Sequence, residues 1–222
     1  SSGNSGSSSG RGNSSFSVGN RENTNTNTEP EQPEVTPEEM PFHDLAEFPW
    51  AKGAIETLYH KKIINGKEEG RFAPRDNLTR EEAVKLLVSA FNLDAKQEDV
   101  TFADCKVDDW YYPYVSIAVK SGIVKGISNE LFGTGNNISR QDFAVMLRRT
   151  LAAGGCKLNG TNAVSFADGE AISEYARADV DALSANGLFL GDETQRFHPK
   201  NNITRAEAAV AIERAMEFAE GS

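Results

Sequence analysis

The sequence lacks the features of a membrane-spanning or nucleic-acid-binding protein. None of its 222 residues falls in an apolar run near the roughly eighteen residues that a membrane-spanning helix needs. Lysine and arginine total 23 against 33 aspartates and glutamates, so the formal net charge is −10. This balance argues against nucleic acid and against insertion into, or loose binding to, an anionic membrane. An anionic ligand would have to bind at local cationic sites.

Cysteine is also scarce. The two residues, Cys105 and Cys156, are compatible with one disulfide or with two free thiols, and the sequence does not choose between them. They form no metal-binding motif, and we expect neither a metal nor a cofactor. The first residues, Ser-Ser-Gly-Asn-Ser-Gly, show no signal peptide, so we expect a processed or excised fragment.

The first part of the chain has few large apolar side chains. Residues 1–38 are rich in Ser, Gly, Asn, Thr, Glu and Pro, with Phe16 and Val18 as the sizeable apolar groups. Such a segment cannot bury enough surface to offset its chain entropy. We therefore predict a disordered linker or arm over 1–38, joined on its N-terminal side to another surface domain.

The rest of the chain contains a threefold internal repeat. An aromatic residue is followed thirty residues later by an arginine in each copy: Trp50 and Arg80, Trp110 and Arg140, Tyr175 and Arg205. The same frame aligns an aliphatic residue, a glycine, a phenylalanine and an asparagine: Ile63, Ile123 and Leu188; Gly66, Gly126 and Gly191; Phe72, Phe132 and Phe197; Asn77, Asn137 and Asn202. A Phe-x-Asp triplet opens each copy, ending at Asp44, Asp104 and Asp168. Agreement at so many positions indicates internal duplication.

Each arginine lies in a motif that predicts a helix start. Thr79, Ser139 and Thr204 can cap a helix, and an acid three residues later can close a capping box. Asp142 is shorter than the glutamates of the other copies, so the middle box should be weakest. A cation in the first turn opposes the helix dipole. Three such arginines indicate an external anionic partner, although pairing with a carboxylate elsewhere in the fold is the alternative.

Apolar residues recur at helical spacing on both sides of each glycine. In the first copy this predicts a helix over about 49–61 and a second one that begins after Thr79. Short helix pairs cannot bury their apolar faces alone, so three must pack together. We predict an all-α fold of three tandem helix-loop-helix repeats, over residues 41–95, 101–153 and 165–219.

Three copies of Phe-x-Asp, an aromatic residue, Ile-x₂-Gly, Phe and (Ile/Leu)-(Thr/Ser)-Arg-x-(Glu/Asp) resemble the S-layer homology module. The resemblance covers about residues 41–218. It implies a pseudo-threefold prism around a central helix bundle. It also implies non-covalent anchoring, outside the cell and at the bacterial cell surface, to peptidoglycan-linked secondary cell wall polysaccharide, which is pyruvylated in many members.

The resemblance assigns roles to particular residues. Arg80, Arg140 and Arg205 would meet the carboxylate of a pyruvate ketal, Asp44, Asp104 and Asp168 would accept sugar hydroxyls, and Trp50, Trp110 and Tyr175 would wall grooves between repeats. Gly70 would give backbone access to the ligand. Because the dipole gives these arginines no local stabilisation, we expect Arg80→Ala and Arg205→Ala each to weaken binding while the fold melts nearly as before. Arg140→Ala should weaken binding least.

This chain departs from the family pattern at several positions. Tyr175 replaces the usual tryptophan, Glu130 and Gln195 replace the glycine present at Gly70, and Gln141 replaces an alanine. We therefore expect unequal grooves, with the elements of the second repeat the most altered.

Two other functions need separate tests. We expect no enzyme activity, because His43, His60 and His198 share no repeat position and have no nucleophile at a recognisable spacing. The stronger alternative is a helical protein–protein adaptor or a self-assembly module of the surface layer, which would use the same grooves for acidic peptides or for copies of itself.

Overall fold

The computed structural model of the chain describes residues 40–94, 100–162 and 164–221. These ranges contain no β-strand and six α-helices, together with the short 3₁₀ helix η1 (Gly169–Ala171): α1 (Pro49–His60), α2 (Arg80–Ala90), α3 (Tyr112–Lys120), α4 (Arg140–Ala153), α5 (Glu174–Ala185) and α6 (Arg205–Glu220). Each repeat supplies two α-helices, which confirms the all-helical class and the three-repeat organisation. The arm predicted for residues 1–38 lies outside the described residues.

The second helix of each repeat starts at the predicted cap. In α2 the Thr79 hydroxyl accepts the N–H of Glu82, and the Glu82 carboxylate accepts the N–H of Thr79. Helix α6 has the same complete capping box. In α4 the Ser139 hydroxyl accepts the N–H of Asp142 but also donates to its short carboxylate at 2.6 Å. The middle box is therefore incomplete, as the shorter acid predicts.

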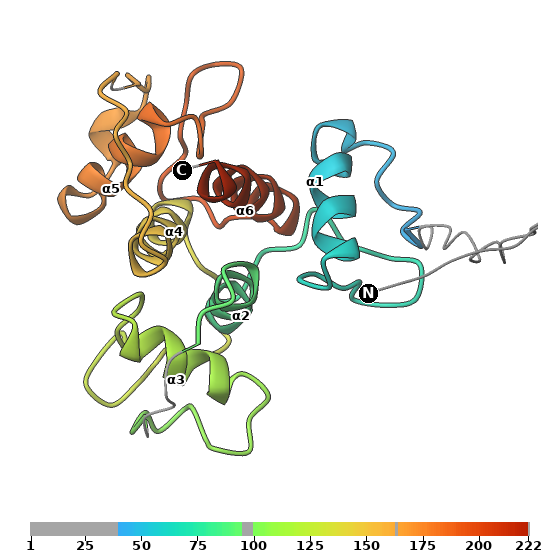
Figure 1. The fold of residues 1–222 in the computed structure, drawn as a ribbon, viewed down its shortest axis with the longest axis vertical. Helices are drawn as coiled ribbons and strands as arrows, with labels where there is room; N and C mark the ends of the chain where they lie inside the picture. The colour runs from blue at the N-terminus through green and yellow to red at the C-terminus, as the bar shows by residue number, and fades with distance from the viewer. Residues whose placement is uncertain (1–39, 95–99, 163, 222) are drawn as a thin grey trace, which may run out of the picture. The chain divides into compact units, whose positions relative to one another are not determined.

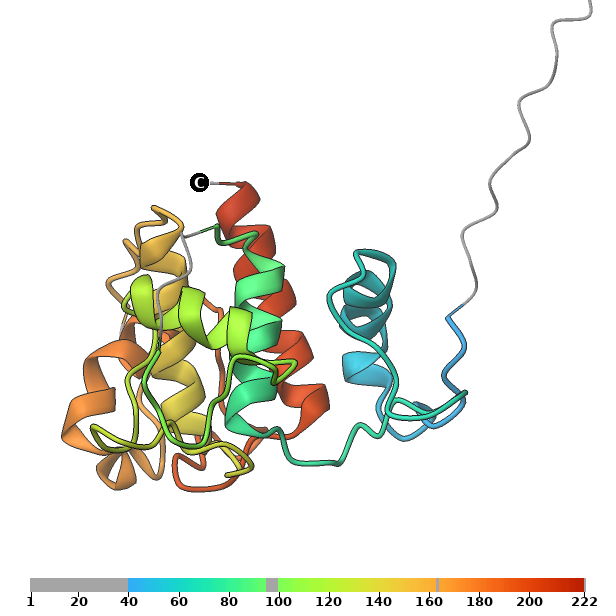
Figure 2. The ribbon, with the colours of Figure 1, turned by 90° about the horizontal axis from the view of Figure 1, so that it is seen from below.

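The helices pack across repeat boundaries. Helices α2, α4 and α6 contact one another, and they are seen nearly end-on at the centre of Figure 1. Helix α3 packs on α2, α5 packs on α4, and α1 packs on α6. Figure 2 shows α2 and α6 running side by side. The first helix of each repeat thus covers the second helix of the preceding repeat, with the first repeat closing onto the third. The repeat visible in the sequence is not the unit of packing.

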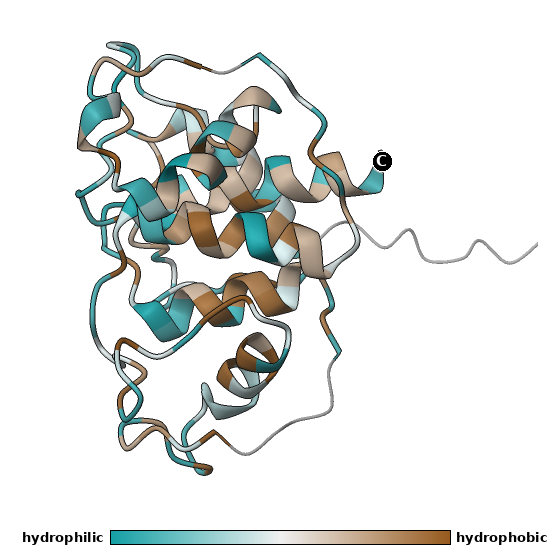
Figure 3. Ribbon diagram, turned by 90° about the vertical axis from the view of Figure 1, so that its left-hand side faces the viewer, coloured by the Kyte–Doolittle hydropathy of each residue, from teal (hydrophilic) through white to brown (hydrophobic). Residues whose placement is uncertain are grey.

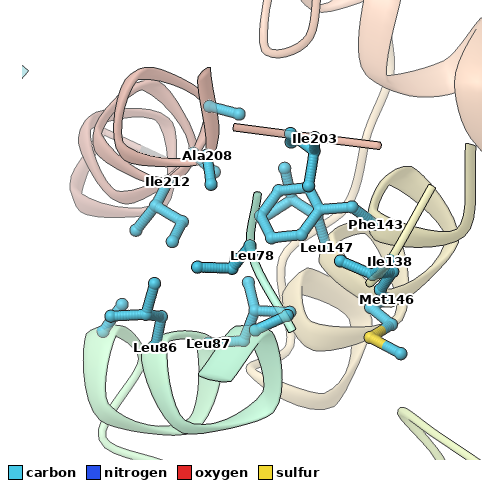
Figure 4. Packing of buried hydrophobic residues seen from close by; sticks show 14 of the residues in the cluster. Leu78, Leu86, Leu87, Ile138, Phe143, Met146, Leu147, Ile203, Ala208 and Ile212 are labelled. Atoms are coloured by element: carbon cyan, nitrogen blue, oxygen red, sulfur yellow. The ribbon is translucent and has the colours of Figure 1, made fainter. Parts of the chain in front are cut away.

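Three backbone hydrogen bonds join the repeats in a closed ring. The N–H of Leu78 donates to the carbonyl of Ile203, Ile203 donates to Ile138, and Ile138 donates to Leu78, each at 3.0 Å. The three side chains are buried, and they point into the interior shared with residues of α2, α4 and α6 (Figure 4). Each bond links a different pair of repeats, so the ring closes only when all three repeats are in place.

The loops between paired helices carry part of the core. Phe72, Phe132 and Phe197 are fully buried, and each lies against the phenylalanine of a Phe-x-Asp triplet at a ring-centroid distance of 5.2–5.8 Å.

Apolar and hydrophilic residues alternate along the helices (Figure 3). No helix in the described part of the chain is long and apolar enough to cross a membrane. Cys105 and Cys156 are both free thiols.

The repeated glycine that follows the first helix of each repeat is needed because its position has no room for a side chain. A Cβ on Gly126 would lie 2.4 Å from the carbonyl oxygen of Ser128 and 2.6 Å from that of Leu131, and Gly66 and Gly191 are similarly crowded. None of the three has a left-handed backbone. The residue with a left-handed backbone that ends the first helix of each repeat lies four residues before this glycine. It is Lys62 in the first repeat and a glycine in the other two. The repeated glycine is therefore needed for its lack of a side chain and not for a left-handed turn.

We predict that Gly126→Ala lowers the free energy of unfolding by about 2–3 kcal/mol, because the new Cβ would overlap two backbone carbonyl oxygens. Gly53→Ala is the matched control, since Gly53 lies within α1 and a Cβ there would meet nothing within 4 Å. It should stabilise the protein by about 0.5–1 kcal/mol. Urea denaturation measures both changes, and equal effects of the two substitutions would contradict the crowding.

Candidate ligand-binding grooves

The arginine of the third repeat is anchored in the first repeat. The Arg205 side chain is buried, its Nε donates to the carbonyl of Phe72 at 3.0 Å, and its Nη2 donates to the carbonyl of Asn65 at 2.7 Å. The guanidinium also lies 4.6 Å from the centroid of the Phe72 ring. Burial lowers the pKa of Arg205, and the nearby Glu82 opposes that shift. The guanidinium stays charged, because its ordinary pKa is so high.

The arginine of the second repeat makes the equivalent contacts in the third. Arg140 Nε donates to the carbonyl of Phe197 at 2.7 Å, and its Nη2 donates to that of Leu190 at 3.3 Å. Its Nη1 also pairs with the carboxylate of Glu207 at 2.9 Å. Glu207 is the acid of the α6 capping box, so one carboxylate both caps a helix and faces an arginine from the preceding repeat.

Arg80 makes fewer contacts than the other two arginines. Its Nη2 donates to the carbonyl of Lys125 at 2.6 Å, and its guanidinium lies 5.0 Å from the centroid of the Phe132 ring. Its Nε is buried and has no hydrogen-bond partner among the described residues. Arg80 is half-buried, whereas Arg140 and Arg205 are each 6% exposed.

These contacts explain why a cation stands in the first turn of each central helix. The arginine binds carbonyls of the next repeat, which offsets the unfavourable dipole. Arg205 thus has partners within the fold that the sequence did not reveal, so we now expect Arg205→Ala to destabilise the fold. Binding of a ligand by the three arginines stays a prediction.

We predict that Arg205→Ala lowers the free energy of unfolding by about 2–4 kcal/mol, because it removes two charge-assisted hydrogen bonds and leaves two carbonyls without that donor. Arg80→Ala, which loses one such bond and a buried unpaired Nε, should cost about 1 kcal/mol. Thermal and urea unfolding compare the two variants. Equal, small losses would show that the arginines do not join the repeats.

The repeated aspartates hold the loop that carries the buried phenylalanine. The two carboxylate oxygens of Asp44 accept the N–H groups of Phe72 and Ala73, at 3.0 and 2.8 Å. Ala73 has a left-handed backbone, as do its equivalents Gly133 and His198. Asp44 therefore fastens a strained loop, and it caps neither the first helix nor the turn before it.

Asp104 and Asp168 make the same bonds in their own repeats. Asp104 accepts the N–H groups of Phe132 and Gly133 at 2.7 Å and that of Thr134 at 3.0 Å. Burial alone would raise the pKa of Asp104, but these bonds outweigh it and lower the pKa to about 2. The pKa of Asp168 is lowered in the same way. Contacts between the three carboxylates and sugar hydroxyls stay a prediction.

Two open grooves bring together the predicted aromatic residues and arginines. The first, which we call the Trp110 groove, has a volume of about 290 Å³ and is lined by the turn at 63–66, by Lys67, Glu82 and Lys85, and by Trp110 and Arg205. The second, the Trp50 groove, has a volume of about 510 Å³ and contains Trp50 and Arg140. The rest of its lining comes from the turn at 189–191, from the α6 face with Arg214, and from four further residues: Asp192, Glu193, His198 and Glu207. Trp110 is 54% exposed and Trp50 is 55% exposed.

Each groove is built from all three repeats. In the Trp110 groove the turn and the central helix come from the first repeat, the tryptophan from the second and the arginine from the third. The Trp50 groove follows the same rule from the third repeat, with Trp50 from the first and Arg140 from the second. The groove between neighbouring repeats that the sequence predicts thus needs a third repeat to supply its arginine.

The hydroxyl of the third aromatic residue, Tyr175, is hydrogen-bonded within the protein, while the side chain is 59% exposed. The Tyr175 hydroxyl donates to the carboxylate of Asp142 at 2.6 Å and accepts the side-chain N–H of Gln141 at 2.6 Å. Burial and the bond to Asp142 raise the pKa of Tyr175 to about 12. Asp142 is the equivalent of Glu82 and Glu207 in the other two grooves. The departures at Tyr175 and Gln141 therefore interact, and they tie the aromatic ring of this site to α4.

Gly70 has a role within its own loop. Its backbone is left-handed, with φ of 70°, and its carbonyl accepts the N–H of His43 at 2.9 Å. Glu130 and Gln195 make the equivalent bond in the other repeats, at 2.8 Å. Gly70 is not among the residues that line the two grooves. Its contact with ligand stays a prediction.

Several groove residues were not predicted from the sequence. Glu82 and Glu207 were expected only as helix caps, although the repeat register that aligns them with the arginine motif was the available signal. Lys85 and Asp192 gave no signal, because their equivalents in the other repeats differ in chemistry.

Comparison with known proteins decides the family. The model of the S-layer homology domain matches residues 41–84, 101–144 and 165–209. The chain belongs to the S-layer homology domain family. Its three domains stand in tandem, with the motif arginine of each one bound to the next and the last bound to the first.

S-layer homology segments of this kind occur in proteins of several sorts. The chain is 31% identical over 172 residues to the surface-layer 125 kDa protein of Lysinibacillus sphaericus, covering 76% of this chain and 14% of that protein. It is 30% identical over 183 residues to the cellulosome-anchoring protein of Acetivibrio thermocellus, covering 81% and 39%. It is 30% identical over 172 residues to the amylopullulanase of Thermoanaerobacterium thermosulfurigenes, covering 77% and 9%. The chain thus spans a minor part of each relative.

Proposed function

We propose that these three S-layer homology domains anchor a surface protein to the bacterial cell envelope by binding peptidoglycan-linked secondary cell wall polysaccharide. The observation that carries the proposal is the pairing, in each of two grooves, of a half-exposed tryptophan with a buried arginine. The relatives named for the surface layer and for cellulosome anchoring support the same role. The proposal places the protein outside the cell, with its remaining domains attached to this module.

The chemistry of the grooves suits a sugar. A tryptophan face packs against the apolar face of a sugar ring, and a guanidinium binds a carboxylate such as that of a pyruvate ketal through two parallel hydrogen bonds. In this proposal the arginines fix the groove through the adjoining repeat and meet the ligand with their remaining donors. Two grooves on one polymer, or on neighbouring chains, would raise the affinity through effective concentration.

The pseudo-threefold prism implied by the resemblance is part of this proposal. The cyclic contacts among α2, α4 and α6 support it, and they would hold the grooves at fixed separations around the central helices. Binding alone, without a chemical step, suffices for anchoring. We therefore propose a non-catalytic role for this module, whatever activity the attached domains have.

The proposal is tested by sedimentation with purified wall sacculi, before and after chemical removal of their accessory polysaccharide. The protein should bind intact sacculi and lose binding to stripped sacculi. A Trp50→Ala/Trp110→Ala variant should bind at least about tenfold more weakly, because exposed aromatic anchors dominate such contacts. Tyr175→Ala, which removes an equally exposed aromatic residue that lines neither groove and whose hydroxyl is bonded to Asp142, is the matched control and should bind nearly as well.

Circular dichroism must show that these variants keep their fold. Undiminished binding to stripped sacculi would contradict the proposal. Binding that follows a surface protein in place of the polysaccharide would favour the adaptor or self-assembly alternative.

A further inference from the structure

The two grooves share an arginine, an acid and a tryptophan but differ in charge. The Trp110 groove contains three cations, Lys67, Lys85 and Arg205, against one carboxylate, Glu82. The Trp50 groove reverses this balance. It contains two cations and three carboxylates, together with one histidine: Arg140 and Arg214; Asp192, Glu193 and Glu207; His198.

The difference comes from two positions that the repeats do not share. The residue after the repeated, crowded glycine is Lys67 in the first repeat, Ile127 in the second and Asp192 in the third. The residue five positions after the motif arginine is Lys85 in the first repeat and valine in the other two. The arginine and the capping acid are kept, so the repeats have diverged at the groove wall and not in the scaffold.

The contacts show which charges are already paired in the Trp110 groove. Glu82 accepts the backbone N–H of Thr79 at 3.0 Å and a hydrogen bond from Lys67, and it also faces Arg205. Burial alone would raise the pKa of Glu82, but the bonds from Lys67 and Thr79 outweigh it and lower the pKa. This single carboxylate therefore stays ionised beside three cations, one of which, Lys85, lies with its Nζ 5.8 Å from the Trp110 ring centroid. The groove keeps an excess of positive charge for a ligand.

In the Trp50 groove the motif arginine and the histidine each contact an acid. Glu207 pairs with Arg140 at 2.9 Å, and Asp192 contacts His198 at 2.7 Å. Glu193 adds a further negative charge to the wall. An anionic ligand entering here would meet like charges, which concave sites make costly because they focus the field.

We propose that the two grooves take different sugars: the Trp110 groove binds a carboxylate-bearing sugar, and the Trp50 groove binds an uncharged sugar. Lys67 and Lys85 are the residues that set this preference, with Asp192 opposing it in the other groove. The proposal rests on the proposed polysaccharide-binding function and adds which ligand charge each groove selects.

The two tryptophans allow each groove to be observed separately. The chain has two tryptophans, and each lies in a different groove, so their indole N–H signals in a ¹H–¹⁵N spectrum report one groove each. Trp50→Phe and Trp110→Phe assign the signals. The probes are a methyl glycoside of N-acetylmannosamine that carries a pyruvate ketal, and the same glycoside without the ketal. The acidic probe should shift the Trp110 signal at a concentration at least about tenfold lower than it needs to shift the Trp50 signal.

Charge-reversal variants test the residues named. Lys67→Asp should lower the affinity of the acidic probe, read at the Trp110 signal, by about tenfold and leave the affinity of the uncharged probe nearly unchanged. Asp192→Lys, the reciprocal change, should make the Trp50 signal respond to the acidic probe, and it keeps the test decisive should Lys67→Asp disturb the fold. Lys157→Asp, at an exposed lysine in the loop after α4 and away from both grooves, is the control.

The outcomes separate this proposal from the proposed function. Equal responses of both indole signals to the acidic probe, or a stronger response at Trp50, would overturn the charge preference and leave polysaccharide binding intact. If neither signal moved with either probe while the protein still bound intact sacculi, the assignment of sugars to grooves would be wrong. Loss of sacculus binding as well would overturn the function itself.

Discussion

The ring of backbone hydrogen bonds among Leu78, Ile138 and Ile203 is the constraint on which the rest of the structure depends. Each of these residues directly precedes a helix cap, so the ring brings the N-terminal ends of α2, α4 and α6 together. Because its three bonds run in one direction around the ring, no pair of repeats can form it alone. Burial of all three residues excludes water that would compete for these bonds.

The arginines add further contacts between the repeats, between this ring of hydrogen bonds and the grooves. Arg140 and Arg205 each bind carbonyls of the following repeat, while the capping acid of that repeat faces the guanidinium. The same contacts place the arginine against the turn that lines a groove. Stability and ligand binding are therefore linked through one side chain. An arginine variant that loses binding must be shown to be folded before the loss is assigned to the ligand.

Sequence reasoning predicted most of the fold, because the repeat register and the caps are local signals. The bounds predicted for the first helix, about 49–61, agree with Pro49–His60, and Asp142 correctly marked the incomplete box. It did not predict that α1 packs on α6, since nothing local shows which helices meet. It also missed the internal partners of Arg205, because the carbonyls of Phe72 and Asn65 lie over 130 residues away in sequence. The hydrogen bond between Tyr175 and Asp142, which are 33 residues apart, was not predicted either, because nothing local shows that they meet.

Native-state hydrogen exchange at the amides of Leu78, Ile138 and Ile203 tests the central claim most directly. If the ring closes only with all three repeats in place, the three amides should exchange with the same free energy, equal to that of global unfolding measured in denaturant. One amide exchanging at a clearly lower free energy than the other two would show that a repeat opens by itself. That result would contradict a fold, and a pair of grooves, that the three repeats build together.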